Sequence, residues 1–186
     1  MQAYSVMFSR KLESEKPNLV NKTIVIILAI SGVILQKISY WAFTLVVKIC
    51  GFIVGKGNIC SVEMASDVKF VFDLGDFYWN RLVCNQFEYE PEMFSLLDLF
   101  SKTNYVFIDC GAIFGFWSLL VSSEKFEKKD VISIEAVPET FNALKRNVNL
   151  NHGNIRIFNN RLLAKVWIVK KSCYFGVWIL QNMTHL

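Results

Sequence analysis

Hydrophobic positions divide the chain into an almost uniformly apolar first part and a second part in which short apolar runs alternate with amphipathic segments. Residues 23–35 carry no charge, and beyond Lys37 the apolar character continues to residue 55 with Lys48 as its only charge. A helix that crosses a bilayer needs about 20 mostly apolar residues, and a central lysine costs roughly 2.5 to 3.5 kcal/mol. The pattern predicts an apolar helical segment over residues 23–66 that either packs on the rest of the protein or associates with a membrane through residues 23–55.

One apolar stripe recurs at helical spacing within this segment, at intervals of three and four residues. The stripe can dock on a core, and a helix that associates with a membrane or spans it is the open alternative. It consists of Ile38, Trp41, Ala42, Leu45, Ile49, Phe52 and Ile53. The polar leader over residues 1–22 is long, and no small-x-small pattern follows the apolar run, which argues against a cleaved signal peptide. We therefore expect a cytoplasmic protein, either free of membranes or associated with one through residues 23–55.

The second part of the chain alternates strand patterns with helix patterns. Strands are predicted at 68–73, 105–108, 131–134 and 155–158, with a further one at 166–169, and helices at 91–100, 116–123 and 138–150. A turn at 74–76 would form a small hairpin with the first of these strands. Strands that alternate with helices predict an α/β fold with a parallel sheet and flanking helices, here in a domain over residues 67–186.

Composition and charge narrow the classes of function. The chain is 53% hydrophobic with a net charge of +4, and its Lys and Arg residues form no dense run, so we do not expect nucleic acid as a partner. The five cysteines are odd in number and form no C-x-x-C pair, and there are only two histidines, so we expect no metal site. A reduced intracellular protein is the simplest interpretation.

A glycine turn follows the strand predicted at 105–108. The strand ends at Asp109, and Gly111, Ala112 and Gly115 come before the next helix. Glycines let the backbone approach a ligand closely, and the N–H groups at the start of the helix would face that ligand. The spacing is D-x-G-x-x-x-G, whereas dinucleotide sites have G-x-G-x-x-G, so a nicotinamide or flavin cofactor is the poorer fit.

Another carboxylate ends the neighbouring strand. Glu135 follows the run at 131–134, and an acid at such a strand tip can accept hydrogen bonds from ribose hydroxyls. Two acids at consecutive strand ends, with a glycine turn between the first strand and its helix, predict a site for a nucleoside cofactor.

These residues resemble the FkbM-type methyltransferases, which use S-adenosylmethionine. The similarity lies in residues 109–120, 134–138 and 147–151, and residues 89–92 are similar to the family's entry segment. The resemblance extends over roughly residues 68–170. It implies the Rossmann-like class I methyltransferase fold and transfer of a methyl group to a hydroxyl on a sugar, polyketide or similar metabolite, so the acceptor would be a small molecule or a glycan.

The resemblance also implies a cofactor site. In it Glu135 would hold the ribose, and the full cofactor-binding set would be Asp109, Gly111, Ala112, Gly115, Glu135 and Glu90. Two positions depart from the family, which usually has Asn where this chain has Ile113 and Pro where it has Ala136. The sequence assigns no catalytic base, because His152 is expected in a solvated loop and His185 lies in the tail.

Residues 104–186 leave room for only part of the family's sheet, at around 30 residues for each strand–helix–strand step. We expect a partial methyltransferase domain that is truncated at its C-terminal side. Its unpaired sheet edge would favour a homodimer unless the apolar segment covers that edge. Two alternatives stay open: a membrane-associated remnant of the fold without catalysis, and, as the weaker one, an NAD-dependent oxidoreductase.

Overall fold

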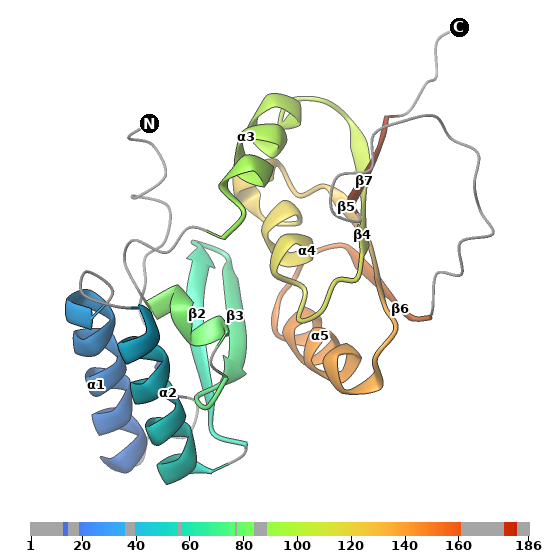
Figure 1. Ribbon diagram of the computed structural model, residues 1–186. Coiled ribbons are helices and arrows are strands. Elements are labelled where there is room, and N and C mark those ends of the chain that lie inside the picture. Colours follow the sequence, from blue (N-terminus) through green and yellow to red (C-terminus); the bar gives the residue numbers. More distant parts are fainter. Residues whose placement is uncertain are drawn as a thin grey trace, which may run out of the picture. The chain divides into compact units, whose positions relative to one another are not determined.

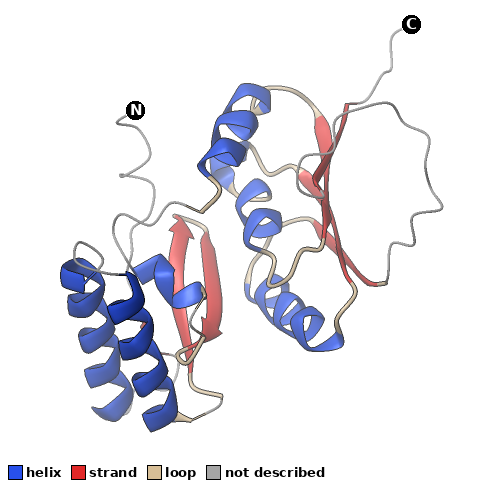
Figure 2. Cartoon of the chain, viewed as in Figure 1, coloured by secondary structure: helices blue, strands red, loops and turns tan. Residues whose placement is uncertain are grey.

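The computed structural model describes residues 13–14, 19–35, 40–55, 57–76, 78–83, 89–160 and 177–181. The chain divides into two compact units, Met1–Pro91 and Glu92–Leu186. Each unit contains helices and a sheet of its own (Figures 1 and 2).

The first unit combines two helices with a three-stranded antiparallel sheet of order β1-β2-β3. Its elements are β1 (Glu13–Ser14), α1 (Leu19–Leu35), α2 (Tyr40–Val54), β2 (Ile59–Ala65), β3 (Val68–Asp73) and the 3-10 helix η1 (Trp79–Val83). The two helices lie side by side next to the β2–β3 hairpin (Figure 1). Fully buried side chains such as Phe43, Phe70 and Phe72 form the core, where the rings of Phe70 and Trp79 meet edge to face at 4.7 Å.

The strand predicted at 68–73 is confirmed as β3, but its partner differs from the prediction. β3 pairs with the preceding β2, from Ile59 opposite Asp73 onward, and the residues after the turn at 74–76 form η1. Ser66 and Asp67 make the turn between the two paired strands. The expected division at 66/67 therefore falls inside a hairpin of the first unit, and the division between the units follows Pro91.

Docking on a core was one of the two interpretations open for the apolar stripe of α2, and the structure places the stripe on the face opposite the core. Phe43, Val47 and Cys50 are the buried residues of α2, whereas Phe52 is 91% exposed and Trp41 73% exposed. The rest of the stripe is half-buried at Ala42, lies outside the described residues at Ile38, and is exposed at Leu45, Ile49 and Ile53. Because α2 is apolar almost all round, its spacing does not determine which side packs.

The first helix shows the same arrangement. Ile24 and Leu28 are buried, while Ile26, Ile30 and Ile34 are each more than half exposed. Among the described residues, eleven of the eighteen exposed large apolar side chains lie on α1 and α2. Within the described part of the chain, neither these nor any other helix combines the length and apolar character that a membrane span requires.

The second unit is built on a four-stranded sheet of order β6-β5-β4-β7. Its elements are α3 (Pro91–Phe100, with Pro91 at the unit boundary), β4 (Tyr105–Cys110), α4 (Phe116–Val121), the 3-10 helix η2 (Glu124–Phe126), β5 (Asp130–Glu135), α5 (Pro138–Leu150), β6 (Ile155–Asn159) and β7 (Val177–Gln181). β4, β5 and β6 are parallel to one another, and β7 is antiparallel to β4. Helices α3, α4 and α5 lie on one face of the sheet (Figures 1 and 2).

The strands predicted at 105–108, 131–134 and 155–158 and the three predicted helices are confirmed, with ends that differ by at most two residues. The tail strand is a correction to the purely parallel sheet, because β7 pairs antiparallel with β4 along the edge that was expected to be unpaired. In the order β6-β5-β4-β7, this strand lies at the opposite edge of the sheet from β6, the strand that precedes it in the chain. The strand predicted at 166–169 lies outside the described residues.

The two faces of this sheet differ in burial. Phe107 and Val131 are buried, whereas Ile108 and Ile132, which point to the other face, are only half-buried. The described helices cover one face, as Figure 2 shows. The second unit is thus an α/β domain with three parallel strands flanked by helices, an arrangement compatible with one side of a Rossmann-like fold.

The corrected face of α2 can be tested with two identical substitutions on one helix. Phe43→Ala should lower the free energy of unfolding by about 3 to 5 kcal/mol, because Phe43 is 0% exposed and its removal leaves a cavity. Phe52→Ala should change it by less than about 0.5 kcal/mol, because Phe52 is 91% exposed. Urea denaturation of both variants measures the difference. Equal losses would show that the face of Phe52 is buried.

Candidate functional site

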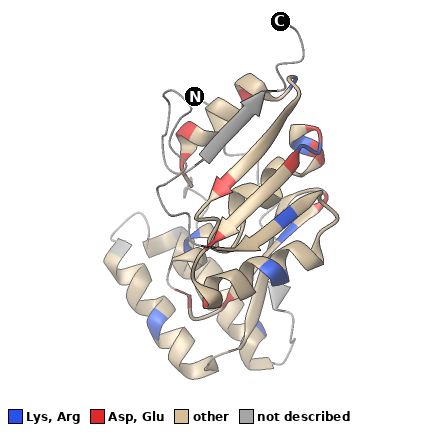
Figure 3. Cartoon of the chain, turned by 90° about the vertical axis from the view of Figure 1, so that its right-hand side faces the viewer, with Lys and Arg blue, Asp and Glu red and all other residues tan. Residues whose placement is uncertain are grey.

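The site predicted from the sequence lies where β4 and β5 end. The two strands are parallel and in register, with Asp109 opposite Ser133 and Cys110 opposite Ile134. Their carboxyl ends therefore meet at one edge of the sheet, and acidic residues stand near both ends (Figure 3). The edge brings together Asp109, the turn that begins at Gly111, and Glu135.

Gly111 is the open position of the turn. It has φ 83°, a left-handed conformation that favours glycine, and it is exposed. A Cβ atom built on Gly111 would have no atom within 4 Å, so a ligand could approach the backbone here. Its N–H donates to the carbonyl of Ile134 over 2.8 Å, which ties the turn to the end of β5.

The other small residues of the turn serve packing. Gly115 is buried, has φ 86°, and leaves only 2.6 Å between a built Cβ and Cδ1 of Leu144 on α5. Ala112 is 6% exposed, and its N–H also donates to the carbonyl of Ile134, over 3.1 Å. The structure thus brings the predicted glycines and Ala112 together in one turn, with Gly111 alone among these three at its exposed surface.

Glu135 is held between two turns. Its side chain is 6% exposed, and its two carboxylate oxygens accept the backbone N–H groups of Ile113 and Val137, each over 2.9 Å. A buried carboxylate needs such donors, because burial without hydrogen bonds would be costly. Each oxygen has a second lone pair, so the fixed carboxylate can still accept a hydroxyl from a ligand.

Asp109 is oriented by two buried serines that sequence reasoning missed. Ser118 Oγ donates to Asp109 Oδ2 over 2.5 Å, and Ser133 Oγ donates to Ser118 Oγ over 2.7 Å. Both serines are 0% exposed, and Asp109 is 5% exposed. One signal was available, because Ser133 interrupts an apolar strand at a position that alternates with Glu135 and so shares its face.

Two amide side chains, one buried and one exposed, fix the backbone around the same edge. Asn147 of α5 donates to the carbonyl of Phe114 over 3.0 Å, and Asn159 at the end of β6 donates to the carbonyl of Glu135 over 2.9 Å. Asn147 was noted only as part of the family resemblance, and Asn159 was not singled out. Short amide side chains next to a turn are typical of such side-chain-to-backbone bonds.

The remaining candidates lie elsewhere. Glu90 belongs to the first unit, next to the unit boundary, and has φ 45°, so its place near the cofactor stays a prediction. His152 follows the end of α5 and is exposed, as expected for a loop residue, while His185 lies outside the described residues. No group of three or more His, Cys, Asp or Glu side chains in the described ranges could hold a metal ion.

The hydrogen bonds of the turn determine what it can bind. The N–H groups of residues 111, 112, 113 and 115 donate to protein acceptors. Phosphate sites at glycine-rich turns depend on N–H groups that point at the anion. This turn instead offers a carboxylate-lined edge, which favours a ligand with hydroxyl groups or positive charge over a pyrophosphate.

Comparison of the chain with protein-family models, with curated proteins and with solved structures gives no match.

The two glycines of the turn should respond differently to the same substitution. Gly115→Ala should cost about 2 to 5 kcal/mol of stability, because it combines a left-handed φ with a clash against Leu144. Gly111→Ala should cost only about 1 to 2 kcal/mol, because its Cβ meets open space. Thermal and urea unfolding of the pair measure both values. A larger loss at Gly111 would contradict this geometry.

Ile113 carries strain that an asparagine would relieve. Its φ of 52° is left-handed, a conformation unfavourable for a β-branched side chain, and the side chain is 41% exposed. The bond to Glu135 uses the backbone N–H, so a substitution keeps it. Ile113→Asn should raise the free energy of unfolding by about 1 kcal/mol, whereas Ile113→Val keeps the branch and should bring no gain. Urea unfolding distinguishes these outcomes, and a destabilised Asn variant would contradict the strain.

Proposed function

We propose that the chain is an S-adenosylmethionine-dependent methyltransferase that binds its cofactor at the carboxyl ends of β4 and β5. The acceptor would be a hydroxyl group on a sugar, polyketide or similar metabolite, as the FkbM resemblance implies. The observation that carries the proposal is the carboxylate of Glu135, fixed by the N–H groups of Ile113 and Val137 beside the open backbone at Gly111.

The residues of this edge fit the cofactor by charge and by hydrogen bonding. Glu135 would accept hydroxyls of the ribose through its free lone pairs. Asp109, held by Ser118, would supply negative charge near the methionine part, which carries a sulfonium and an ammonium group. Gly111 leaves the space for the ligand to approach. When bound, the cofactor would supply the methyl group, and the protein's main task would be to position the acceptor oxygen.

A nicotinamide cofactor is disfavoured by the same edge. A pyrophosphate would need N–H donors from the turn, and the N–H groups of residues 111, 112, 113 and 115 already donate to acceptors within the protein. Two carboxylates next to it would also repel the phosphates. The D-x-G-x-x-x-G spacing predicted this preference, and the hydrogen bonds give its physical reason.

No catalytic base is assigned. Burial and the charge of Glu127 raise the pKa of Tyr105 to about 12, so this tyrosine at the start of β4 stays protonated at neutral pH. His152 is exposed beyond the end of α5. A second candidate function is binding of the nucleoside without transfer of a methyl group. The observation that favours it is β7, which pairs antiparallel with β4 and so occupies the edge of that strand.

Calorimetric titration with S-adenosylhomocysteine tests the site without needing an acceptor. The unmodified chain should bind, and Glu135→Gln should weaken binding at least about tenfold, because the neutral amide accepts ribose hydroxyls less well. The matched control is Glu139→Gln, an exposed glutamate in the first turn of α5, which should bind like the unmodified chain.

A second variant covers the case in which Glu135→Gln does not fold. Gly111→Ala places a methyl group in the open space of the turn and should weaken the same binding while the protein stays folded. Binding of NAD without binding of S-adenosylhomocysteine would overturn the proposal. Binding in all variants alike would place the nucleoside elsewhere.

A further inference from the structure

Helices α1 and α2 each leave an apolar side exposed. The connection between them is residues 36–39, so helices that pack side by side across it must run in opposite directions. Six of their eleven exposed large apolar residues fall at intervals of three and four within each helix, which places them along one side of that helix. We call this surface the outer stripe, and it consists of Ile26, Ile30, Ile34, Leu45, Ile49 and Phe52.

The opposite side of each helix packs in the core of the first unit, so the outer stripe stays exposed. Ile24 and Leu28 of α1 and Phe43 and Val47 of α2 are the buried partners, each 3% exposed or less. Gly51 brings α2 close to the turn after β3, since a built Cβ would lie 2.6 Å from Cα of Gly75. The packing side is therefore settled within the first unit, and the outer stripe is not part of that core.

The charged residues of α1 and α2 indicate which kind of surface the outer stripe can bind. The two helices contain two charged residues, Lys22 and Lys48, and both are lysines. Lys22 lies four residues before Ile26, and Lys48 lies three after Leu45 and four before Phe52, so each borders the stripe. A basic border beside an apolar face matches an anionic lipid surface, where lysine reaches the headgroups and the apolar side chains enter the acyl boundary.

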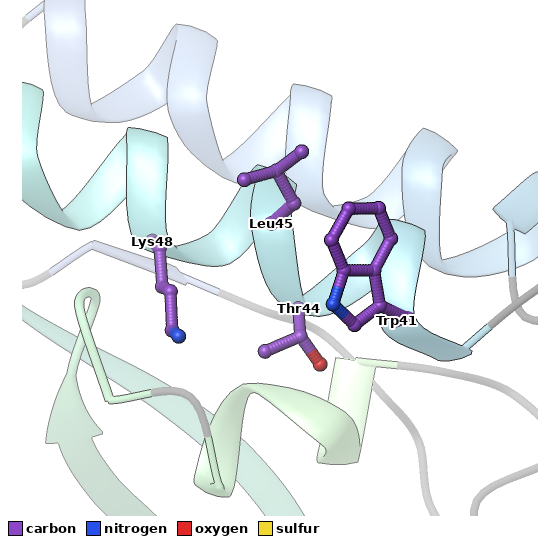
Figure 4. Close-up of a pocket in the computed structure, with 4 residues that line it drawn as sticks. All are labelled: Trp41, Thr44, Leu45 and Lys48. Carbon is purple, nitrogen blue, oxygen red and sulfur yellow. The ribbon is translucent and has the colours of Figure 1, made fainter.

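A small cavity lies beside the same residues of α2. Trp41, Thr44, Leu45 and Lys48 line a cavity of about 240 Å³, and all four come from α2 (Figure 4). Tryptophan beside lysine is typical of segments at the headgroup level of a bilayer. Lys48 and Phe52 also border a larger cavity together with Asp73 and Asp76, so two acidic residues lie near this end of the outer stripe.

We propose that the α1–α2 hairpin lies flat on an anionic lipid surface through its outer stripe. Helices of 17 and 15 residues suit an interfacial position along the surface. A second copy of the chain fits the stripe less well, because no acidic residue of either helix would pair with the lysines that such a contact desolvates. This inference is independent of the cofactor site.

Flotation of the full chain with vesicles tests the proposal. Phosphatidylcholine vesicles that contain phosphatidylserine should carry the unmodified chain, and phosphatidylcholine alone should carry less. Phe52→Glu and Ile30→Glu should each lower vesicle binding at least about tenfold. Each substitution removes an apolar side chain that would be buried in the lipid, and adds a negative charge that the anionic headgroups repel. Lys48→Gln should lower binding to the anionic vesicles about fivefold.

The matched control is Leu99→Glu, the same type of change at a 74% exposed residue of α3, and it should bind like the unmodified chain. Far-ultraviolet circular dichroism checks that the variants fold. An unmodified chain that stays unbound, or a Phe52→Glu variant that binds equally well, would overturn the proposal. A lipid-free dimer that Phe52→Glu dissociates in sedimentation velocity would also overturn it, because the stripe would then belong to a second copy.

Discussion

The carboxylate of Glu135 accepts the N–H groups of Ile113 and Val137, and in this way it joins the turn after β4 to the turn after β5. A buried carboxylate is tolerated only where donors replace water, so the turn must take the path that brings Ile113 to it. That path requires left-handed backbone at Gly111, Ile113 and Gly115. The open backbone at Gly111 and the close packing of α5 at Gly115 accompany the two hydrogen bonds that Glu135 accepts from Ile113 and Val137.

The same edge shows how buried polar groups support one another. Asp109, Ser118 and Ser133 form a chain of hydrogen bonds across β4, α4 and β5, and Asn159 adds a bond to the carbonyl of Glu135 from β6. Three consecutive parallel strands are thus cross-linked at their ends by side chains as well as by their ladders. Such a rigid edge suits a site that must hold a ligand in a fixed orientation.

The sequence predicted the elements of the second unit well, because prolines, glycines and acids mark their ends. Pro91 and Pro138 begin helices, and Gly111 begins the turn after β4. The hydrogen-bond partners of Ser118 and Ser133 could not be predicted, since a serine in a helix or strand has no spacing that names its partner. The tail strand was missed as well, because its pairing with β4 depends on contacts between distant parts of the chain.

In the first unit the hydrophobic pattern located the helices but not their orientation. Helix α2 carries a single charge, so either apolar side satisfies the spacing, and the bulk of Phe43 and the close approach of Gly51 to Gly75 decide the packed side. The partner of β3 was misassigned for a related reason. A strand pattern gives the faces of a strand but not its neighbour, and here the two-residue turn at Ser66 and Asp67 selects β2.

The antiparallel pairing of β7 with β4 has a consequence for synthesis on the ribosome. β4, β5 and β6 emerge in sequence and can pair as soon as they leave the tunnel, whereas the other edge of β4 waits for the residues of β7, from Val177 to Gln181. Until then the nascent sheet presents an unpaired edge with apolar residues beside it. The unfinished chain, more than the completed one, is therefore the species exposed to edge-to-edge aggregation and the one on which chaperones would act.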